Sequence, residues 1–411
     1  MMKIELFIAN RMRSKKHYKN SVSNRIIKIA VFAVSLGIIM MIISISVGFG
    51  FQKEIKDKTS AFTGHIIVSP FENNNSSISI TPFDSSNRSI TKVLNLSQIT
   101  NYNFIVNKGS IIKSKSDFDG IILKGVGKKY LWENISFIKM RGQFLKTSGN
   151  LKNEIFLSKR TSEKLDVSIG DTLSLFFQNN NKSFPSHRKL IIVGYFESGF
   201  PDFDDNFAMI DIRHIQKINN WKSNQIGRIE IFINDINNLD NITNKIYENL
   251  PPEIDAVSVK SKYKNIYDWI ALFDFNILII ISLMLVIAIF NMATALFVLI
   301  IDRTRMIGLL KSLGAKNSII QKVFLVNSFY ILLEGLFYGN LIGLIIILAQ
   351  DRFGIVKLDP SIYYVSDVPI FISFKIILLL NFGVLFFCMI SLWIPSLIIS
   401  KVSPSNVMRL N

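Results

Sequence analysis

The chain alternates between segments of ordinary polarity and four long apolar stretches, which are uncharged except for Glu334 in the third. A bilayer core about 30 Å thick needs about 20 apolar residues at 1.5 Å rise, and a soluble helix rarely runs so long without a charge. The pattern therefore predicts four membrane helices. Their predicted ranges along the chain are 29–51, 269–301, 323–350 and 376–400.

Residues 52–268 carry a different pattern, typical of a folded domain outside the bilayer. Alternating or β-rich runs predict strands, and a few runs at helical spacing predict short helices, so we expect an α+β domain of one or two subdomains. The stretch 73–101 is rich in Asn, Ser and Thr and is interpreted as a loop or weakly ordered insertion. The predicted strands are 65–71, 109–115, 120–125, 154–158, 172–178, 190–196 and 228–234, and the predicted helices are 159–167 and 238–250.

Basic residues predict the orientation. Residues 1–28 hold eight Lys or Arg against one acid, and the short loop 302–322 holds five against one, whereas 351–375 is neutral. By the positive-inside rule the two basic segments and the tail 401–411 are cytoplasmic, and the domain 52–268 lies outside, because long domains cross largely regardless of charge. We expect an α-helical membrane protein with both termini inside.

The N-terminus is predicted to be a retained anchor. The basic lead and the apolar stretch that follows are too long for a cleaved signal, and Ser46–Phe51 is not an A-x-A site. Ile4, Phe7, Ile8 and Met12 recur at helical spacing, which predicts a short amphipathic helix in the inner interface. A frayed basic tail is the alternative.

Charge and candidate chemistry exclude several function classes. The net charge is +17, but the outer domain holds 29 basic and 23 acidic residues, so the surplus lies mostly in the flanks and does not favour nucleic acid. The only cysteine, Cys388, lies in the fourth predicted span, so no disulfide is expected in the outer domain. The four histidines lack the spacing of metal ligands, and we expect no metal site.

Catalytic motifs are also missing from the sequence. It contains no G-x-x-x-x-G-K-[ST], so we expect no bound nucleotide and no catalytic residues. The acidic run Asp202–Asp205 could bind a cation, but a solvated turn after Gly199-Phe200-Pro201 is the preferred interpretation. The chain is therefore predicted not to be an enzyme.

Two predicted helices are longer than a bilayer requires. The range 269–301 would span about 50 Å as a helix, against about 30 Å of hydrocarbon. The first span leads directly into the helix-compatible segment 52–58. We expect both helices to continue into the outer domain as stalks, which would connect it mechanically to the membrane part.

The inner loop carries the most specific local pattern. Met306, Leu309, Leu310 and Leu313 are predicted to share one helical face, and Gly314 can end this helix in a left-handed cap. Asn317 or Ser318 can then cap the helix that enters the third span. The pattern alone is also compatible with an inert interfacial turn.

The third predicted span contains small residues at four-residue spacing. Gly335, Gly339 and Gly343 form a face suited to close helix packing. Glu334 is costly in lipid and should face protein or water. A hydrogen bond that supports helix packing is preferred over a proton relay.

Asp302–Lys316, D-R-T-R-M-I-G-L-L-K-S-L-G-A-K, resembles the coupling segment E-R-T-R-E-I-G-[IV]-L-[RK]-A-[LM]-G-A of the MacB/FtsX/LolC-LolE superfamily of ABC transporter permeases. The likeness extends along the chain and is greatest to the lipoprotein-releasing LolC/LolE type. Asp302 and Met306 depart from the pattern, which weakens the case for a specific ion pair between these positions and the partner ATPase. The other matching segments are 48–58 with Gly64-His65-Ile66, Gly194–Phe200 with Asp204, and the ending from Pro395 to Arg409.

The resemblance implies a permease subunit that binds no cofactor itself, in the bacterial inner membrane. ATP and Mg²⁺ would be used by a cytoplasmic ATPase dimer, and a second permease, identical or paralogous, would complete the membrane part. Lipoprotein cargo would enter from the membrane lipid and pass to a periplasmic carrier. The residues implied in ATPase coupling are Arg303, Arg305, Met306, Gly308, Leu309, Leu310, Lys311, Leu313, Gly314 and Ala315.

The implied cargo path is a lateral apolar cleft between the first and second helices of facing subunits. The candidate lining residues are Ile42, Ile45, Phe49, Phe273 and Leu278. These side chains could instead face lipid or neighbouring helices. Two alternative functions remain open: a MacB-like exporter of drugs or peptides with a separate ATPase, and an FtsX-like regulator of murein hydrolases, whose outer domain is usually smaller.

Overall fold

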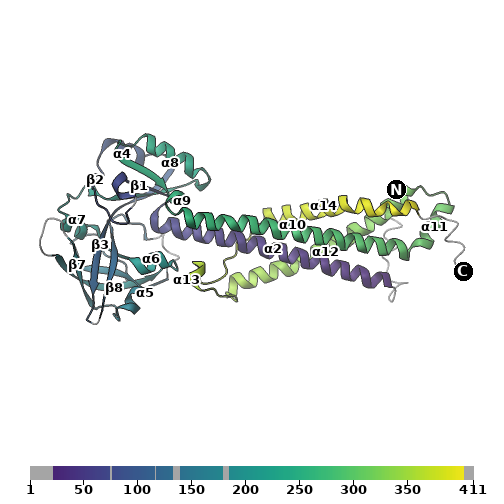
Figure 1. Cartoon of the computed structure of the whole chain (residues 1–411), viewed down its shortest axis with the longest axis horizontal. Coiled ribbons are helices and arrows are strands. Elements are labelled where there is room, and N and C mark those ends of the chain that lie inside the picture. The colour runs from purple at the N-terminus through teal and green to yellow at the C-terminus, as the bar shows by residue number, and fades with distance from the viewer. Residues whose placement is uncertain (1–21, 75, 116, 133–138, 179–184, 402–411) are drawn as a thin grey trace. The chain divides into compact units, whose positions relative to one another are not determined.

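The computed structural model forms two compact units (Figure 1). The helical unit comprises the described parts of Met1–Gln52, Ile270–Val356 and Val368–Asn411, and the outer unit comprises Lys53–Trp269 and Lys357–Asp367. The predicted amphipathic helix within 1–28 and most of the tail 401–411 lie outside the described residues. The structure describes residues 22–74, 76–115, 117–132, 139–178 and 185–401.

Four described helices are long and apolar enough to cross a membrane. Their apolar stretches are those predicted from the sequence. The first three helices extend beyond the predicted spans at both ends because polar flanks continue the helical turn, whereas the fourth begins at Phe374 and ends at Ser396, short of the predicted residue 400. Parts of both α2 and α10 belong to each unit, as expected of stalk helices. The four are α2 (Val22–Thr63), α10 (Lys264–Asp302), α12 (Asn317–Phe353) and α14 (Phe374–Ser396); the shorter α11 (Thr304–Ser312), α13 (Pro360–Tyr363) and α15 (Ile398–Lys401) complete this part of the chain.

Helices α2 and α12 approach closely at three glycines of α12. A Cβ atom added at Gly335, Gly339 or Gly343 would lie 2.6, 2.6 and 3.2 Å from side-chain atoms of α2. The opposing residues are Val34, Ile38 and Ile42, which are buried. Ser35 Oγ also donates to the Gly335 carbonyl at 3.0 Å. Small residues thus allow the backbones to approach, and Glu334 lies partly exposed beside them.

Helices α12 and α14 are joined by a reciprocal pair of amides. Asn340 Nδ2 donates to Asn381 Oδ1 at 2.6 Å, and Asn381 Nδ2 donates to Asn340 Oδ1 at 2.9 Å. Each amide satisfies the other where lipid offers no partner, so the pair sets the register of the two helices.

The outer unit is built on a ten-stranded mixed sheet. Its order is β12-β1-β11-β3-β4-β9-β6-β8-β5, and β7 pairs with β3 and β8. The pairs β4–β9 and β6–β8 are parallel, and the other pairs are antiparallel. The strands are β1 (Ile66–Pro70), β3 (Ile99–Lys113), β4 (Phe118–Val126), β5 (Lys139–Gly142), β6 (Glu154–Ser158), β7 (Thr172–Phe177), β8 (Ser186–Glu197), β9 (Phe207–Asp211), β11 (Arg228–Ile233) and β12 (Ile254–Ser258); β2 (Phe83–Asp84) and β10 (Gln225–Ile226) form a separate pair.

Short helices cover this sheet and enclose an aliphatic core. The inward residues of the strands, such as Ile66, Leu123 and Ile210, are fully buried. The predicted α+β class is therefore confirmed, and all seven predicted strands and both predicted helices overlap observed elements. The helices are α3 (Phe71–Asn74), α4 (Arg88–Leu94), α5 (Lys159–Lys164), α6 (Pro201–Asn206), α7 (Ile212–Asn219), the 3₁₀ turn η2 (Ile236–Asn238), α8 (Leu239–Glu248) and α9 (Val259–Lys262).

The interpretation of 73–101 as a loop was wrong. This stretch contains the end of α3, β2, α4 and the start of β3. The buried Asn73 side chain explains the order, because it donates to the carbonyls of Thr81 and Gly227 and accepts from the Ile80 and Thr81 amides. A polar composition here serves internal hydrogen bonds rather than solvation.

The acidic run Asp202–Asp205 was also interpreted wrongly as a solvated turn. It forms most of α6, which has Pro201 in its first turn, and Asp204 is buried. The Asp204 carboxylate accepts from Ser198 N, Ser198 Oγ and Gly199 N at 2.9, 2.7 and 3.0 Å. The carboxylate thus holds the preceding loop in place.

Candidate functional site

The segment between α10 and α12 forms the short helix α11, and Gly314 ends it. Gly314 has φ +86°, a left-handed conformation that side chains with a Cβ rarely adopt. Its N–H donates to the Lys311 carbonyl, and the Ala315 N–H donates to the Leu310 carbonyl at 2.9 Å. The predicted left-handed cap is present. The predicted capping of α12 by Asn317 or Ser318 is wrong, because Lys316 takes the N-cap position and makes no side-chain cap bond.

The predicted apolar face of α11 is divided between interior and surface. Met306 and Leu310 pack against the core of the helical unit beside the buried Ile307. Leu309 and Leu313, one turn apart, are 61% and 77% exposed. The apolar stripe is wide enough to serve two surfaces, and its outer edge is the Leu309–Leu313 pair.

Charged residues of the segment have different settings. Lys311 Nζ donates to the carbonyls of Ile399 and Ser400 at 2.7 and 3.2 Å, which ties α11 to the end of the α14–α15 region. Arg305 is exposed, and Arg303 lies 3.7 Å from the Asp302 carboxylate. Gly308 is buried beside Ile307. Lys311 thus has a structural partner within the chain.

The five candidate cleft residues do not share one exposed face. Ile42 and Ile45 are buried in the helical unit, where Ile42 faces Gly343. Phe49 and Phe273 are half-buried, and only Leu278 is largely exposed, at 62%. Burial within the helical unit therefore removes Ile42 and Ile45 from an exposed cleft surface.

Helices α2 and α10 contact each other near the outer end of the helical unit. The rings of Phe51 and Phe273 stack at 5.2 Å, and Gln52 Nε2 donates to Asp274 Oδ1 at 2.7 Å. Phe273 is therefore partly used in pairing these two helices. The exposed residues of α10 nearby include Leu272, Phe275 and Leu278.

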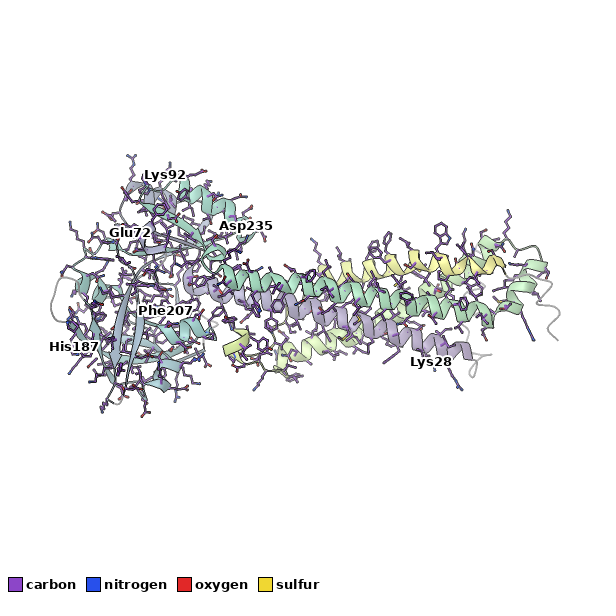
Figure 2. The ribbon with its side chains drawn as sticks, in the orientation of Figure 1. Lys28, Glu72, Lys92, His187, Phe207 and Asp235 are labelled. Carbon is purple, nitrogen blue, oxygen red and sulfur yellow. The ribbon has the colours of Figure 1, made fainter. Side chains whose placement is uncertain are left out.

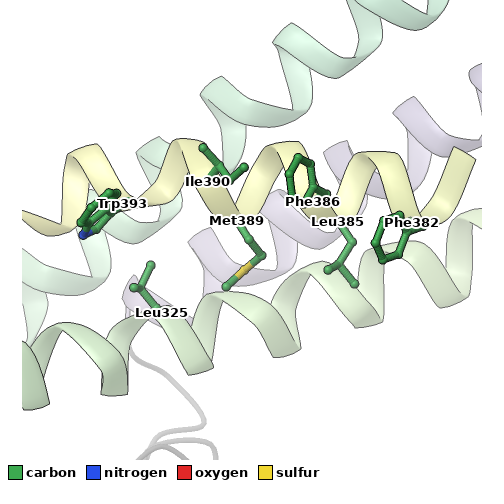
Figure 3. Close-up of a pocket in the computed structure, with 7 residues that line it drawn as sticks. All are labelled: Leu325, Phe382, Leu385, Phe386, Met389, Ile390 and Trp393. Atoms are coloured by element: carbon green, nitrogen blue, oxygen red, sulfur yellow. The ribbon is translucent and has the colours of Figure 1, made fainter.

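An apolar groove runs between α12 and α14 (Figure 3). Its volume is about 430 Å³, and all seven lining side chains are apolar or aromatic. Such a lining suits contact with lipid tails and offers no group for acid–base chemistry. The lining residues are Leu325, Phe382, Leu385, Phe386, Met389, Ile390 and Trp393.

The outer end of α2 is bound to the sheet by a buried lysine, Lys124 of β4, whose ion-pair partner is Glu230 of β11. Lys124 Nζ lies 2.8 Å from Glu230 Oε1 and also donates to the Phe62 carbonyl in the last turn of α2. The ammonium lies 4.5 Å from the Phe62 ring centroid. Burial lowers the pKa of Lys124 and raises that of Glu230, and each charge opposes the shift of the other. A cation at this carbonyl also complements the helix dipole.

The chain leaves α2 through Gly64 and His65. Gly64 has no space for a side chain, since an added Cβ would lie 3.0 Å from Glu230 Cβ. His65 Nδ1 accepts the N–H of Ile233 at 3.0 Å, and burial lowers the pKa of His65 to about 4. This ring is therefore neutral in the folded outer unit at neutral pH.

The pKa of His65 predicts a loss of stability in acid. The unfolded state has a His pKa near 6.5, so it binds the proton more tightly than the folded state between pH 6.5 and 4. His65 should therefore leave the free energy of unfolding unchanged above pH 6.5 and lower it by up to about 3 kcal/mol as the pH drops to 4. Urea unfolding at several pH values measures this loss. His65→Gln should remove most of it and His187→Gln, at an exposed position (Figure 2), should not; equal slopes for both variants would contradict the assignment.

Sequence reasoning missed the residues that anchor α2. A Lys in an alternating strand is usually a solvated residue, so Lys124 carried no signal, and Glu230 is separated from it by more than a hundred residues. Asp204 was noticed within a motif, but its burial was not predicted. Gly64 was a partial signal, because a glycine at the end of a long helix indicates that another segment approaches closely. The sequence does not say which segment this is.

Two family models cover most of the chain. The MacB-like periplasmic core domain matches residues 29–248, and the FtsX-like permease C-terminal matches residues 278–404. The first match covers most of α2 and most of the outer unit, and the second covers most of α10 together with α11, α12 and α14. The two matches follow each other in the order in which the chain forms the parts of its fold.

Several known proteins are similar over their whole length. An uncharacterized membrane protein of Buchnera aphidicola (from Schizaphis graminum) is 24% identical, covering 98% of this chain and 99% of its own. The lipoprotein-releasing system transmembrane protein LolE of Haemophilus influenzae is 22% identical over 99% of both chains, and LolC of the same Buchnera is 25% identical over 93% of both. The solved periplasmic region of MacB from Actinobacillus actinomycetemcomitans matches 49% of this chain and 91% of its own at 13% identity, with a TM-score of 0.35, a likeness too slight to add to the fold assignment.

Proposed function

Because the chain belongs to the family of FtsX-like permeases with a MacB-like periplasmic core domain, we propose that it is the membrane subunit of an ABC transporter that releases lipoproteins from the inner membrane. It is a multi-pass protein of the bacterial inner membrane. The observation that carries the choice of cargo is the likeness to LolC and LolE proteins over nearly the full length of both chains.

Energy for release would come from a partner ATPase dimer on the cytoplasmic side. The exposed Leu309–Leu313 pair of α11 would sit in a groove of that ATPase, which would bind ATP and Mg²⁺. The buried side of α11 and the Lys311 bonds to the Ile399 and Ser400 carbonyls would pass its displacement to the membrane helices. This chain would contribute binding and movement, and the hydrolysis would take place on the partner.

Movement would reach the outer unit along α2 and α10. Both helices are continuous across the boundary between the units, and an unbroken helix transmits displacement along its axis. The Lys124–Glu230 pair would hold the end of α2 to strands β4 and β11, so that the sheet follows the helix. A second permease, identical or paralogous, would present the same parts on the other side.

Cargo would enter from the outer leaflet against the exposed apolar face of α10. Each buried CH₂ of an acyl chain contributes about 0.8 kcal/mol, so an apolar surface can hold a lipoprotein without polar recognition. Leu278 belongs to this face, together with Leu272 and Phe275. Closure of the paired subunits would then expel the cargo to a periplasmic carrier.

A photo-crosslinker at Leu278 tests this function. We expect it to capture acylated lipoproteins in the absence of ATP and to lose them when ATP is added. A crosslinker at Leu378 of α14, an equally exposed apolar position, is the matched control and should capture phospholipid only. If Leu278 captured acylated and non-acylated cargo equally, the result would contradict lipoprotein release and favour a MacB-like exporter. Capture of no secreted protein at all would favour an FtsX-like regulator.

The proposed orientation places both termini and α11 in the cytoplasm, as the basic flanks of the spans favour. A reporter that is active only in the cytoplasm should work when fused at Ala315 or Asn411 and fail at Asn150. Activity of the Asn150 fusion would overturn the orientation.

A further inference from the structure

Three segments connect the outer unit to membrane-spanning helices, and each brings an aromatic ring to α6 or to the residue before it. Phe62, at the end of α2, stacks on Phe203 at 4.3 Å. Tyr263, which precedes α10, meets the same ring edge-on at 6.1 Å. Tyr364, from the loop between α12 and α14, stacks on Phe200 at 4.6 Å. Phe200 and Phe203 themselves stack at 5.3 Å, so the five rings form one continuous aromatic junction.

The centre of the aromatic junction is held rigidly. Phe200 and Phe203 are buried, and the Asp204 carboxylate accepts from Ser198 and Gly199, directly before Phe200. The Asp204 carbonyl accepts from Thr161 Oγ1 at 3.2 Å and from Ser158 Oγ, which ties α6 to α5. Asp204 thus positions both central rings. This explains why Asp204 follows the Gly194–Phe200 motif at a short distance.

Tyr364 occupies a backbone position that usually favours glycine. It follows the last residue of α13, and its φ is +61°, which is rare for a bulky side chain. Contacts compensate for this conformation: the ring stacks on Phe200 and meets Trp269 edge-on at 6.0 Å, and the carbonyl accepts from Lys58 at 3.5 Å. A glycine would relieve the backbone but remove the ring. The ring contacts with Phe200 and Trp269 are what a tyrosine supplies at this position and a glycine cannot.

We propose that the aromatic junction is the joint at which movements of the spans converge on the outer unit, with Phe200, Phe203 and Tyr364 as its contact residues and Asp204 as a positioning residue. This inference rests on the proposed function and adds to it a role for the loop between α12 and α14. Through this loop, displacement of α12 and α14 would act on the same point of the outer unit as α2 and α10. A joint connected to all four membrane-spanning helices would move with them as one body.

The test compares Tyr364→Gly with Tyr364→Phe in the complex purified with its ATPase. Tyr364→Gly suits the backbone and removes the ring, whereas Tyr364→Phe keeps the ring. Coupling between sites typically changes a response by 5–150-fold, so we expect Tyr364→Gly to release about ten-fold less lipoprotein per ATP hydrolysed. The ATPase rate and the unfolding temperature should stay near wild type. Tyr364→Phe and Ile362→Ala, the latter at an exposed position of the same loop, should release normally.

A second readout separates this inference from the identity of the cargo. With Cys388 replaced by Ala, fluorophores at Lys245 and Lys322, two exposed positions in different units, should change their energy transfer when ATP is added. The change should disappear in Tyr364→Gly and persist in Tyr364→Phe. Persistence in both variants, or equal release by both, would overturn the joint. A wild-type complex that changes its energy transfer but releases no lipoprotein would overturn the proposed cargo and leave the joint standing.

Discussion

Replacing Glu230 with Gln should lower the unfolding temperature of the outer unit by roughly 10 °C. The change leaves the Lys124 ammonium buried without its counter-charge, and breaking a buried pair in this way costs about 3–5 kcal/mol. In a domain of 150–250 residues each kcal/mol shifts the midpoint by about 2–4 °C. The loss should shrink at higher pH, because burial lowers the pKa of Lys124 and alkaline conditions reduce the cost of losing its proton. Thermal unfolding of the purified chain at pH 7 and 9.5 measures both effects.

Two controls make this result specific. Asp240→Asn removes a pair with Lys260 in which both side chains are more than half exposed, and exposed pairs contribute only about 0–1 kcal/mol. The double change Lys124→Met with Glu230→Leu removes both charges and should recover much of the loss. If Glu230→Gln unfolds within a degree of wild type, the pair does not stabilise the end of α2.

Leu309→Glu combined with Leu313→Glu should abolish binding of the ATPase while membrane insertion continues. These are the exposed apolar residues of α11, and a charge buried without a partner in the ATPase groove costs several kcal/mol. We expect the co-purifying ATPase to fall by more than about ten-fold, which corresponds to 1.4 kcal/mol. Leu310→Glu would be a less specific test, because Leu310 packs within the helical unit.

The matched control for this prediction is the pair Leu309→Met and Leu313→Met. It keeps the apolar surface and the helix propensity, so the ATPase should remain bound. Wild-type amounts of ATPase on the double Glu variant, measured on chains that insert normally, would remove the coupling role of α11.

The spans and many strands could be predicted because their signals are local. A stretch such as 29–51 contains no charge over more than five helical turns. The alternation at the start of the predicted strand 172–178 describes a half-buried strand directly, and every second residue of β7 is buried. The strand β9 was missed since its five residues stand between two short helices and its partners β4 and β6 are distant in the sequence. Local periodicity carries no information about such pairing.

The candidate site was predictable as a segment but not as a surface. Helical spacing placed Met306, Leu309, Leu310 and Leu313 on one side of α11, yet a wide stripe can face both the interior and an outside partner, and only packing decides between them. The anchoring residues needed the fold itself. Lys124 and Glu230 become partners only when β4, β11 and α2 meet, and the two charges are unremarkable in isolation.

The position of β1 in the sheet has a consequence for biosynthesis. β1 lies between β11 and β12, so both of its neighbours are synthesised about 160 residues or more after it. At 5–20 residues per second the ribosome needs roughly 8–30 seconds to make that length of chain. During this time the buried, apolar strand β1 has no partner, which exposes it to wrong strand pairing. The nascent outer unit should therefore depend on holding chaperones until β11 has been synthesised.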